Sequence, residues 1–268
     1  MLRYLSIVII SSFLILSCSP NNVTIENSYE KYFTQNAVRG TFAIYNNGQS
    51  NFIIYNLNRY KDSAYSPAAT FNTLNSLIGL QKGIIPNENK VVAQDSIDKA
   101  SNQIYTGISL DSALKSSSYA YFSSLSRAIG EKEMKYWIDS IKYGNKNIRN
   151  IDSFWMNNAL KITPDEALGF IEKVYFNQLP FQKRVQNIVK KTLIKEFNAN
   201  YQLAYQTGTT MNEKNHQIGW IVGWIEENKH PYFFVINTEG DKAYNIKTIE
   251  TSVLKPILKD LGFFNGKK

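Results

Sequence analysis

The chain has 268 residues, of which 43% are hydrophobic and 19% are charged, and 30 lysines and arginines against 22 acidic residues give a formal net charge of +8. This composition is typical of a globular protein and excludes a disordered, collagen-like or multi-span membrane chain. A single cysteine excludes an internal disulfide, and the sequence has no cysteine–histidine cluster for a structural zinc ion. The lysines are scattered rather than gathered in one block, which favours a solvated surface and argues against nucleic-acid binding. We expect neither a metal nor a cofactor.

The N-terminus has the pattern of an export signal. Arg3 precedes a 12-residue apolar run, Leu5–Leu16, which is too short for a permanent membrane span and has the length of a signal-peptide core. Ser17 and Cys18 follow, and this aliphatic–small–cysteine order resembles the bacterial lipobox, which implies a thioether to diacylglycerol on the Cys18 thiol. We therefore predict a signal peptide over residues 1–17 and an exported lipoprotein, anchored to a membrane through Cys18 and facing the periplasm or the cell exterior. An ordinary secretory signal with an incidental cysteine is the alternative.

Strands are predicted near both ends of the mature chain. Residues 18–30 are polar and are expected to form a tether. Thr41–Tyr45 and Asn51–Tyr55 flank an Asn-Gly turn, which predicts a hairpin. A second hairpin is predicted from Ile218–Ile225 and Tyr232–Asn237.

The spacing of apolar residues between the hairpins predicts helices. Helices are expected over Thr70–Gln81, Tyr119–Ile129, Glu131–Tyr143, Thr163–Asn177 and Thr248–Leu261. The fourth begins with Thr163-Pro-Asp-Glu166, a capping box with proline at the first helical position. The predicted fold class is α/β (α+β): an antiparallel sheet built from both termini, flanked by helices, with a mainly helical inserted region, in one domain over residues 31–268.

Several short motifs occur in an order that is typical of one family. They are Tyr65–Asn72, Arg127–Gly130, Tyr143–Asn145, Asp152–Trp155, Leu160–Pro164, Asn177–Phe181, Thr207–Gly208 and Ile218–Trp220. Each motif is weak alone. In this order, over residues 38–262, they resemble the class D (oxacillinase-type) serine β-lactamases and the related antibiotic-sensor domains of the penicillin-binding transpeptidase-like family. The resemblance implies a β-lactamase/transpeptidase-like fold and acyl-transfer chemistry.

That chemistry uses a serine at the start of a helix as nucleophile and a lysine three residues later as general base, because residues three apart share one helix face. A strand lysine before Thr-Gly completes the set. Carried onto this sequence, the nucleophile position holds Ala69, the base position holds Asn72, and the strand-lysine position holds Gln206. The resemblance therefore implies that no catalytic set is intact.

Other positions of the family's site are retained. The second serine is Ser117, and Trp155, Thr207 and Gly208 also match, so these four residues are predicted to bind a ligand. Glu250 stands where an arginine often grips the substrate carboxylate. Because the fold motifs are retained while the catalytic residues are replaced, we predict a catalytically inactive binding or structural module at the cell envelope. Its expected partner is a peptidoglycan peptide, a β-lactam or an envelope protein.

Two alternatives stay open. The first is an active serine β-lactamase, a β-lactam hydrolase with acyl-enzyme chemistry, in which Ser66 or Ser117 substitutes for the missing nucleophile. The second is a sensor that binds a β-lactam or a peptidoglycan peptide without hydrolysing it. Covalent labelling by a penicillin separates the first alternative from a non-catalytic module.

Overall fold

The computed structural model describes residues 22–91 and 107–268. The predicted signal peptide over residues 1–17 and the predicted lipid site at Cys18 lie outside the described residues. Within the described ranges, no helix combines the length and apolar character needed to cross a bilayer.

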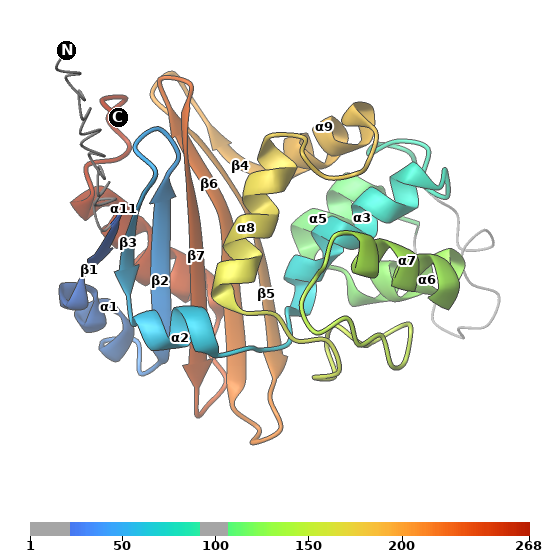
Figure 1. The fold of residues 1–268 in the computed structure, drawn as a ribbon, viewed down its shortest axis with the longest axis horizontal. Coiled ribbons are helices and arrows are strands. Elements are labelled where there is room, and N and C mark those ends of the chain that lie inside the picture. Colours follow the sequence, from blue (N-terminus) through green and yellow to red (C-terminus); the bar gives the residue numbers. More distant parts are fainter. Residues whose placement is uncertain (1–21, 92–106) are drawn as a thin grey trace, which may run out of the picture.

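A seven-stranded sheet forms the centre of the domain, in the order β1-β3-β2-β7-β6-β5-β4 (Figure 1). Neighbouring strands are antiparallel except for β1 and β3, which are parallel. The first three strands come from the N-terminal part and the other four from the C-terminal part, so the predicted sheet built from both termini is confirmed. The strands are β1 (Val23–Ile25), β2 (Arg39–Asn46), β3 (Asn51–Tyr55), β4 (Ile194–Phe197), β5 (Gln202–Met211), β6 (Gln217–Glu227) and β7 (His230–Gly240).

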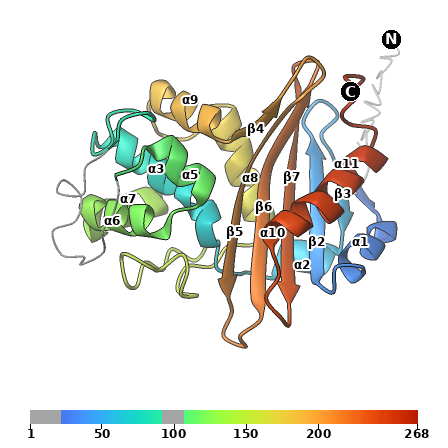
Figure 2. The ribbon, with the colours of Figure 1, turned by 180° about the vertical axis from the view of Figure 1, so that it is seen from behind.

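Helices cover both faces of this sheet. They are α1 (Glu30–Thr34), α2 (Leu57–Asp62), α3 (Asn72–Gln81), α5 (Leu110–Ser116), α6 (Tyr119–Ile129), α7 (Glu131–Ser140), α8 (Pro164–Tyr175), α9 (Lys183–Thr192), α10 (Ile246–Ile249) and α11 (Lys255–Asp260). Short 3-10 turns occur at Asn27–Tyr29 and Ala68–Phe71, and a π-helical turn at Glu250–Leu254 joins α10 to α11. Figure 1 shows α3, α5, α6, α7 and α9 as a helical region beside the sheet, and Figure 2 shows α10 and α11 across the opposite face.

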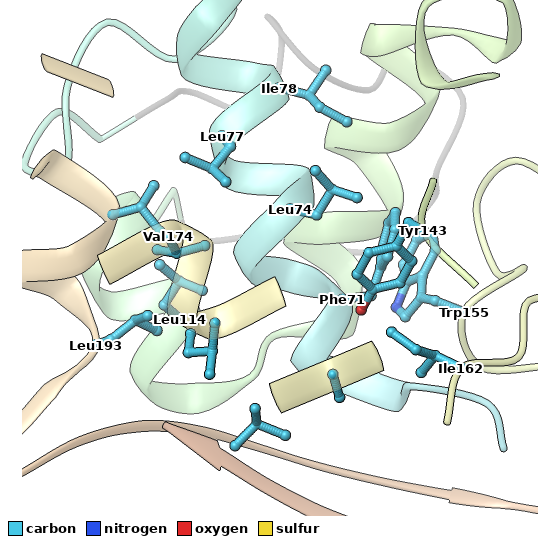
Figure 3. Packing of buried hydrophobic residues seen from close by; sticks show 14 of the residues in the cluster. Phe71, Leu74, Leu77, Ile78, Leu114, Tyr143, Trp155, Ile162, Val174 and Leu193 are labelled. Carbon is cyan, nitrogen blue, oxygen red and sulfur yellow. The ribbon is translucent and has the colours of Figure 1, made fainter. Parts of the chain in front are cut away.

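The two sides of the sheet carry separate hydrophobic clusters because successive strand residues point to opposite faces. In β2, Phe42 and Ile44 pack toward the α10–α11 side, whereas Ala43 packs toward the helical region. The larger cluster surrounds α3, whose residues are buried from Asn72 to Leu80. Figure 3 shows Leu74 and Leu77 of α3 packed inside this cluster. Because nearly every residue of α3 and of the preceding 3-10 turn is buried, both elements are held firmly against the sheet.

Several predicted elements are confirmed, although most of their bounds shift by a few residues. Helix α6 spans Tyr119–Ile129 as expected. Helix α8 begins with the predicted capping box, in which the Glu166 backbone N–H donates to Thr163 Oγ1 and the Glu166 carboxylate accepts from the Thr163 backbone N–H. Both predicted hairpins form, as β2–β3 and β6–β7.

Three of the differences in bounds have a local physical reason. The expected tether over residues 18–30 is too long, because Val23–Ile25 pairs with β3 and α1 begins at Glu30. Helix α7 ends at Ser140 rather than at residue 143, since Lys142 adopts a left-handed φ of 56° that a helix does not continue through. The last helical segment begins earlier than expected, where the Asn245 side chain caps α10.

Candidate functional site

A cleft of about 410 Å³ lies where the start of α3, the end of α5 and strand β5 meet. It is lined by Ala69, Asn72, Lys115, Ser116, Ser117, Tyr119, Trp155, Met156, Thr207, Gly208, Thr209 and Ile246. The fold therefore brings together six of the residues singled out in the sequence, although they come from four separate segments of the chain. The seventh, Gln206, is only 2% exposed and contacts the cleft residue Ser117 from strand β5.

Ala69 sits in the 3-10 turn at the edge of the cleft, close to strand β5. A Cβ added to Gly208 would lie 2.6 Å from the Ala69 backbone nitrogen, so only glycine allows the strand to approach this closely. Glycine at position 208 thus preserves the close approach of strand and turn, while the side chain at position 69 is a methyl group with no reactive atom.

The two hydroxyls nearest Ala69 in sequence are held by backbone carbonyls. The Ser66 hydroxyl donates to the Trp155 carbonyl oxygen at 2.7 Å, and Ser66 is fully buried. The Thr70 hydroxyl donates to the Pro67 carbonyl oxygen at 2.6 Å. Neither residue lines the cleft, whereas Ser117 does.

Asn72, at the base position, is 2% exposed at the start of α3. Its Oδ1 atom is buried and accepts no hydrogen bond from the described residues. A buried acceptor without a donor costs about 1–3 kcal/mol, so this oxygen is suited to a buried water molecule. The carboxamide offers hydrogen bonds but no basic nitrogen.

Gln206 joins strand β5 to the end of α5. Its Nε2 donates to the Ser117 hydroxyl oxygen and to the Leu114 carbonyl oxygen, each at 3.2 Å. Ser117 has a left-handed φ of 51° at the C-terminus of α5, and this conformation turns the chain into α6. The amide of Gln206 therefore holds Ser117 at the cleft through neutral hydrogen bonds rather than through a charge.

Trp155 is 1% exposed, and its ring stacks on Phe71 with centroids 5.5 Å apart. Its carbonyl oxygen accepts from the Ala68 backbone N–H at 2.9 Å as well as from Ser66. Trp155 is therefore mainly a core residue that fixes the turn carrying Ala69. Tyr119, which the motif comparison did not select, is 49% exposed and presents the larger aromatic surface to the cleft. Its position two residues after Ser117 was the signal that could have identified it.

The charged groups near the cleft are basic. Lys115 lines it and is paired with Asp111 at 2.7 Å, and no carboxylate side chain lines it among the described residues. Lys195 sits at an irregularity in the pairing of β4 with β5, where burial, reinforced by the nearby Lys115 charge, lowers its pKa. Glu250, expected at the cleft, is instead 3% exposed and bound to Lys247 at 2.7 Å.

Strand β5 has an open edge along the cleft. Strand β4 pairs with Gln202–Ala204 only, whereas the whole length of β5 pairs with β6 on its other side. Thr207–Thr209 therefore faces the cleft with no strand beside it in the described part of the chain. An open strand edge offers backbone N–H and C=O groups to an extended ligand. The described residues contain no group of histidine, cysteine and acidic side chains that could hold a metal ion.

Comparisons with known proteins agree with this geometry. Residues 27–259 match the family of the penicillin binding protein transpeptidase domain. Beta-lactamase OXA-19 of Pseudomonas aeruginosa is 32% identical over 249 residues, covering 92% of this chain and 93% of that protein. The probable beta-lactamase YbxI of Bacillus subtilis is 35% identical over 217 residues, covering 81% and 80% of the two chains.

Solved structures of the same family superimpose closely. The class D β-lactamase FUS-1 (OXA-85) of Fusobacterium nucleatum has a TM-score of 0.80 and 27% identity, covering 90% of this chain and 100% of that one. The C-terminal domain of the Bacillus licheniformis BlaR penicillin-receptor has a TM-score of 0.81 and 27% identity, covering 90% and 97%. The chain therefore belongs to the penicillin-binding protein transpeptidase family and is a homologue of the class D β-lactamases.

Proposed function

We propose that this protein is a non-catalytic binding module of the cell envelope, attached to a membrane by lipid on Cys18. The observation that carries the proposal is Ala69, a residue without a nucleophilic atom at the nucleophile position of a well-formed cleft. Removing the nucleophile of a serine hydrolase costs about 10⁶-fold in rate. The chain keeps the architecture of a β-lactamase while lacking the atom that forms the acyl-enzyme.

The surroundings of Ser117 support the same conclusion. A serine becomes a nucleophile when an adjacent base removes its proton. Ser117 accepts from the amide of Gln206, and the amide of Asn72 lines the same cleft, whereas the nearby Lys115 ammonium is paired with Asp111 at 2.7 Å. Neither amide takes up a proton near neutral pH. Ser117 is therefore expected to serve as a hydrogen-bonding group for a ligand.

The ligand class that fits the cleft best is an extended peptide, from peptidoglycan or from an envelope protein. The open edge of β5 at Thr207–Thr209 offers backbone hydrogen bonds to such a peptide. Asn72 lines the cleft with a carboxamide that can hydrogen-bond a peptide group, and the half-exposed Tyr119 offers a surface for an apolar side chain.

A second candidate function is non-hydrolytic β-lactam sensing. It is favoured by the similarity to the BlaR penicillin-receptor domain, which extends over 90% of this chain. The replaced strand lysine at Gln206 weakens this candidate, because a neutral amide attracts the carboxylate of a β-lactam less than an ammonium group does.

Penicillin labelling tests the central proposal. The mature chain, residues 18–268 with Cys18→Ser, is incubated with a fluorescent penicillin and with nitrocefin. We expect an unchanged intact mass and no nitrocefin turnover above buffer. A mass increase equal to one β-lactam that disappears in Ser117→Ala would overturn the proposal in favour of a substitute nucleophile.

Peptide titration tests the ligand class. A synthetic peptidoglycan stem peptide is titrated into the same chain by calorimetry, alongside the variants Asn72→Ala and Tyr119→Ala. Tyr136→Ala is the matched control, because Tyr136 is 61% exposed on α7 and does not line the cleft. We expect heat for the parent chain and the control and a weakened signal for both cleft variants. Equal binding by all four proteins would exclude the cleft as the peptide site.

Acylation of Cys18 has its own test. The native protein is purified from membranes, and the mass of its N-terminal peptide is measured. The proposal requires a diacylglycerol adduct on Cys18 and release of the Cys18→Ser protein from the membrane fraction. An unmodified cysteine would leave an ordinary secreted protein.

A further inference from the structure

Three segments far apart in sequence meet at one end of the sheet. They are the β2–β3 turn at residues 46–51, the β6–β7 turn at residues 228–229 and the C-terminal residues 264–268; we call this region the hairpin end. His230 Nε2 lies 2.9 Å from Asn46 Oδ1, and the Asn228 amide donates to the Lys268 carbonyl oxygen at 2.9 Å. Figure 1 shows the C-terminus beside these two hairpins.

A buried carboxylate fixes the C-terminal residues in place. Glu227, at the end of β6, is 1% exposed. It accepts hydrogen bonds from the backbone N–H groups of Phe264 at 2.5 Å, Lys267 at 2.9 Å and Lys268 at 3.1 Å. Chain ends are usually poorly ordered unless they are tied down. Here the hydrogen bonds to Glu227 hold two exposed lysines, Lys267 and Lys268, at defined positions on the surface.

The two lysines form one side of a pocket of about 380 Å³. Apolar side chains and polar side chains share the rest of its wall, which consists of Ile44, Asn46, Gln49, Asn51, Ile53, Tyr232, Leu261 and Phe263. No carboxylate side chain lines this pocket among the described residues. The nearby Asp260 is engaged by Lys31 and by the Tyr32 hydroxyl. Lys229, exposed in the β6–β7 turn, is a third lysine at the hairpin end, where the carboxylate of Glu227 described above is buried.

The proposed lipid site is tied to the same end by chain length. The Asn22 carbonyl oxygen accepts from the Phe52 backbone N–H at 2.6 Å, so the described chain begins beside β3 and next to the pocket residue Asn51. Four residues, fully extended, span at most about 14 Å. A lipid on Cys18 would therefore hold the hairpin end within that distance of the membrane surface.

We infer that the hairpin end is a docking surface for anionic phospholipid headgroups. Lys267 and Lys268 pair with the phosphate, Lys229 adds attraction, and the pocket between them receives the uncharged part of the headgroup. The inference rests on the proposed attachment through Cys18, which places this surface at the membrane. Charge complementarity supports the choice of lipid, because each lysine near an anionic leaflet strengthens binding about fivefold.

This docking orients the binding cleft. Thr209 pairs with Gly219, eight residues before Glu227 along β6. At about 3.4 Å per residue, the cleft lies roughly 27 Å along the sheet from the hairpin end. Contact of the hairpin end with the membrane would therefore turn the cleft away from it, toward ligands in the surrounding compartment.

Vesicle binding tests the inference without the lipid anchor. The chain 18–268 with Cys18→Ser is sedimented with vesicles of phosphatidylcholine alone, or with about one quarter phosphatidylglycerol, at about 0.05 M and about 0.3 M salt. We expect binding to the anionic vesicles only, weakened by salt. Lys267→Gln/Lys268→Gln should reduce the partition coefficient at least tenfold. The matched control Lys214→Gln/Lys242→Gln removes two exposed lysines from the other end of the sheet and should change it less than twofold.

Three outcomes would each overturn the inference. They are an equal fall of the partition coefficient in the two double variants, equal binding to both vesicle types, and no binding to either vesicle type. These outcomes are independent of the proposed function. The chain tested carries no acyl group, and neither penicillin labelling nor peptide titration depends on the hairpin end. Circular dichroism of both variants verifies that exposed glutamines leave the fold unchanged.

Discussion

The side-chain amide of Gln206 donates a hydrogen bond to the hydroxyl oxygen of Ser117 across 3.2 Å, joining β5 to the end of α5. Class D-like chemistry would place a lysine at this strand position. The neutral amide keeps the two sides of the cleft together without an ammonium group. The two sides of the cleft are therefore held together by neutral hydrogen bonds at this point, which leads to the first prediction.

Restoring three residues should restore acylation. In the variant Ala69→Ser/Asn72→Lys/Gln206→Lys, the new serine and lysine lie three residues apart on one helix face. Position 72 is 2% exposed, and burial lowers the pKa of a lysine, which favours the neutral amine that accepts a proton. We expect the intact mass to rise by one β-lactam after incubation with a penicillin. The double variant Asn72→Lys/Gln206→Lys, with Ala69 kept, should show no adduct. An inert but folded triple variant would mean that the cleft itself has changed shape.

Two glycine substitutions should have opposite effects on stability. Gly208→Ala places a Cβ 2.6 Å from the Ala69 nitrogen and should lower the free energy of unfolding by about 1–3 kcal/mol. Gly169→Ala, in the middle of α8, meets no atom within 4 Å and should raise it by about 0.5–1 kcal/mol, because alanine is the better helix former. Urea unfolding of both variants measures the difference. A neutral Gly208→Ala would show that the strand and the turn can separate at little cost.

Replacement of the carboxylate that holds the C-terminal residues should also destabilise the fold. Glu227→Gln keeps the shape of the side chain but replaces one acceptor oxygen with an NH₂ group that cannot accept, so at least one of the three hydrogen bonds from backbone N–H groups is lost. The free energy of unfolding should therefore fall by about 1–3 kcal/mol. Hydrogen exchange at the Lys267 amide should become faster. The control Glu213→Gln alters an exposed ion pair with Lys161 and should change stability by less than about 0.5 kcal/mol. Unchanged exchange at Lys267 would contradict the role given to Glu227.

The ion cluster around Glu239 should make stability depend on pH. Burial raises the pKa of Glu239, but hydrogen bonds from His216 and Arg59 outweigh it, and the net pKa is below its ordinary value of 4.5. A carboxyl with a lowered folded-state pKa stabilises the fold above pH 4.5 and loses this effect as pH falls through the folded value. Glu239→Gln should therefore cost about 2 kcal/mol near pH 7 and progressively less below about pH 4.5. Urea titrations at several pH values test this, and a cost that stays constant would argue against it.

The sequence predicted the elements whose stability is local or whose apolar pattern is regular. The α8 capping box is a contact between residues three apart, and the Asn-Gly turn between β2 and β3 specifies a hairpin from adjacent residues. Residues 23–25 were predicted to belong to the tether, because three residues are too few to show an alternation of apolar and polar side chains. They form strand β1 only through their pairing with β3. Strand β5 was not predicted from the sequence apart from its Thr-Gly motif. Gln206 and the polar residues after it lie at the cleft, so they do not give the apolar pattern of a core strand.

The candidate site was predicted as a set of residues but not as a set of contacts. Collinear motifs selected Ala69, Asn72 and Ser117, and the structure places all three around one cleft. Motifs could not show that Ser66 is buried against the Trp155 carbonyl, because 89 residues separate the two. They also could not show that Glu250 is buried and paired with Lys247 on the same helical stretch.

The pairing of β2 with β7 has a consequence for how the chain is made. Phe42 lies opposite Ile236, so the centre of the sheet joins residues on the order of 190 positions apart. The N-terminal hairpin remains without its neighbour until nearly the whole chain has left the ribosome, and its apolar side chains stay exposed until then. A premature stop before His230 would consequently leave β2 without the β7 strand that joins it to the C-terminal part of the sheet, and the truncated chain would be prone to aggregation and degradation.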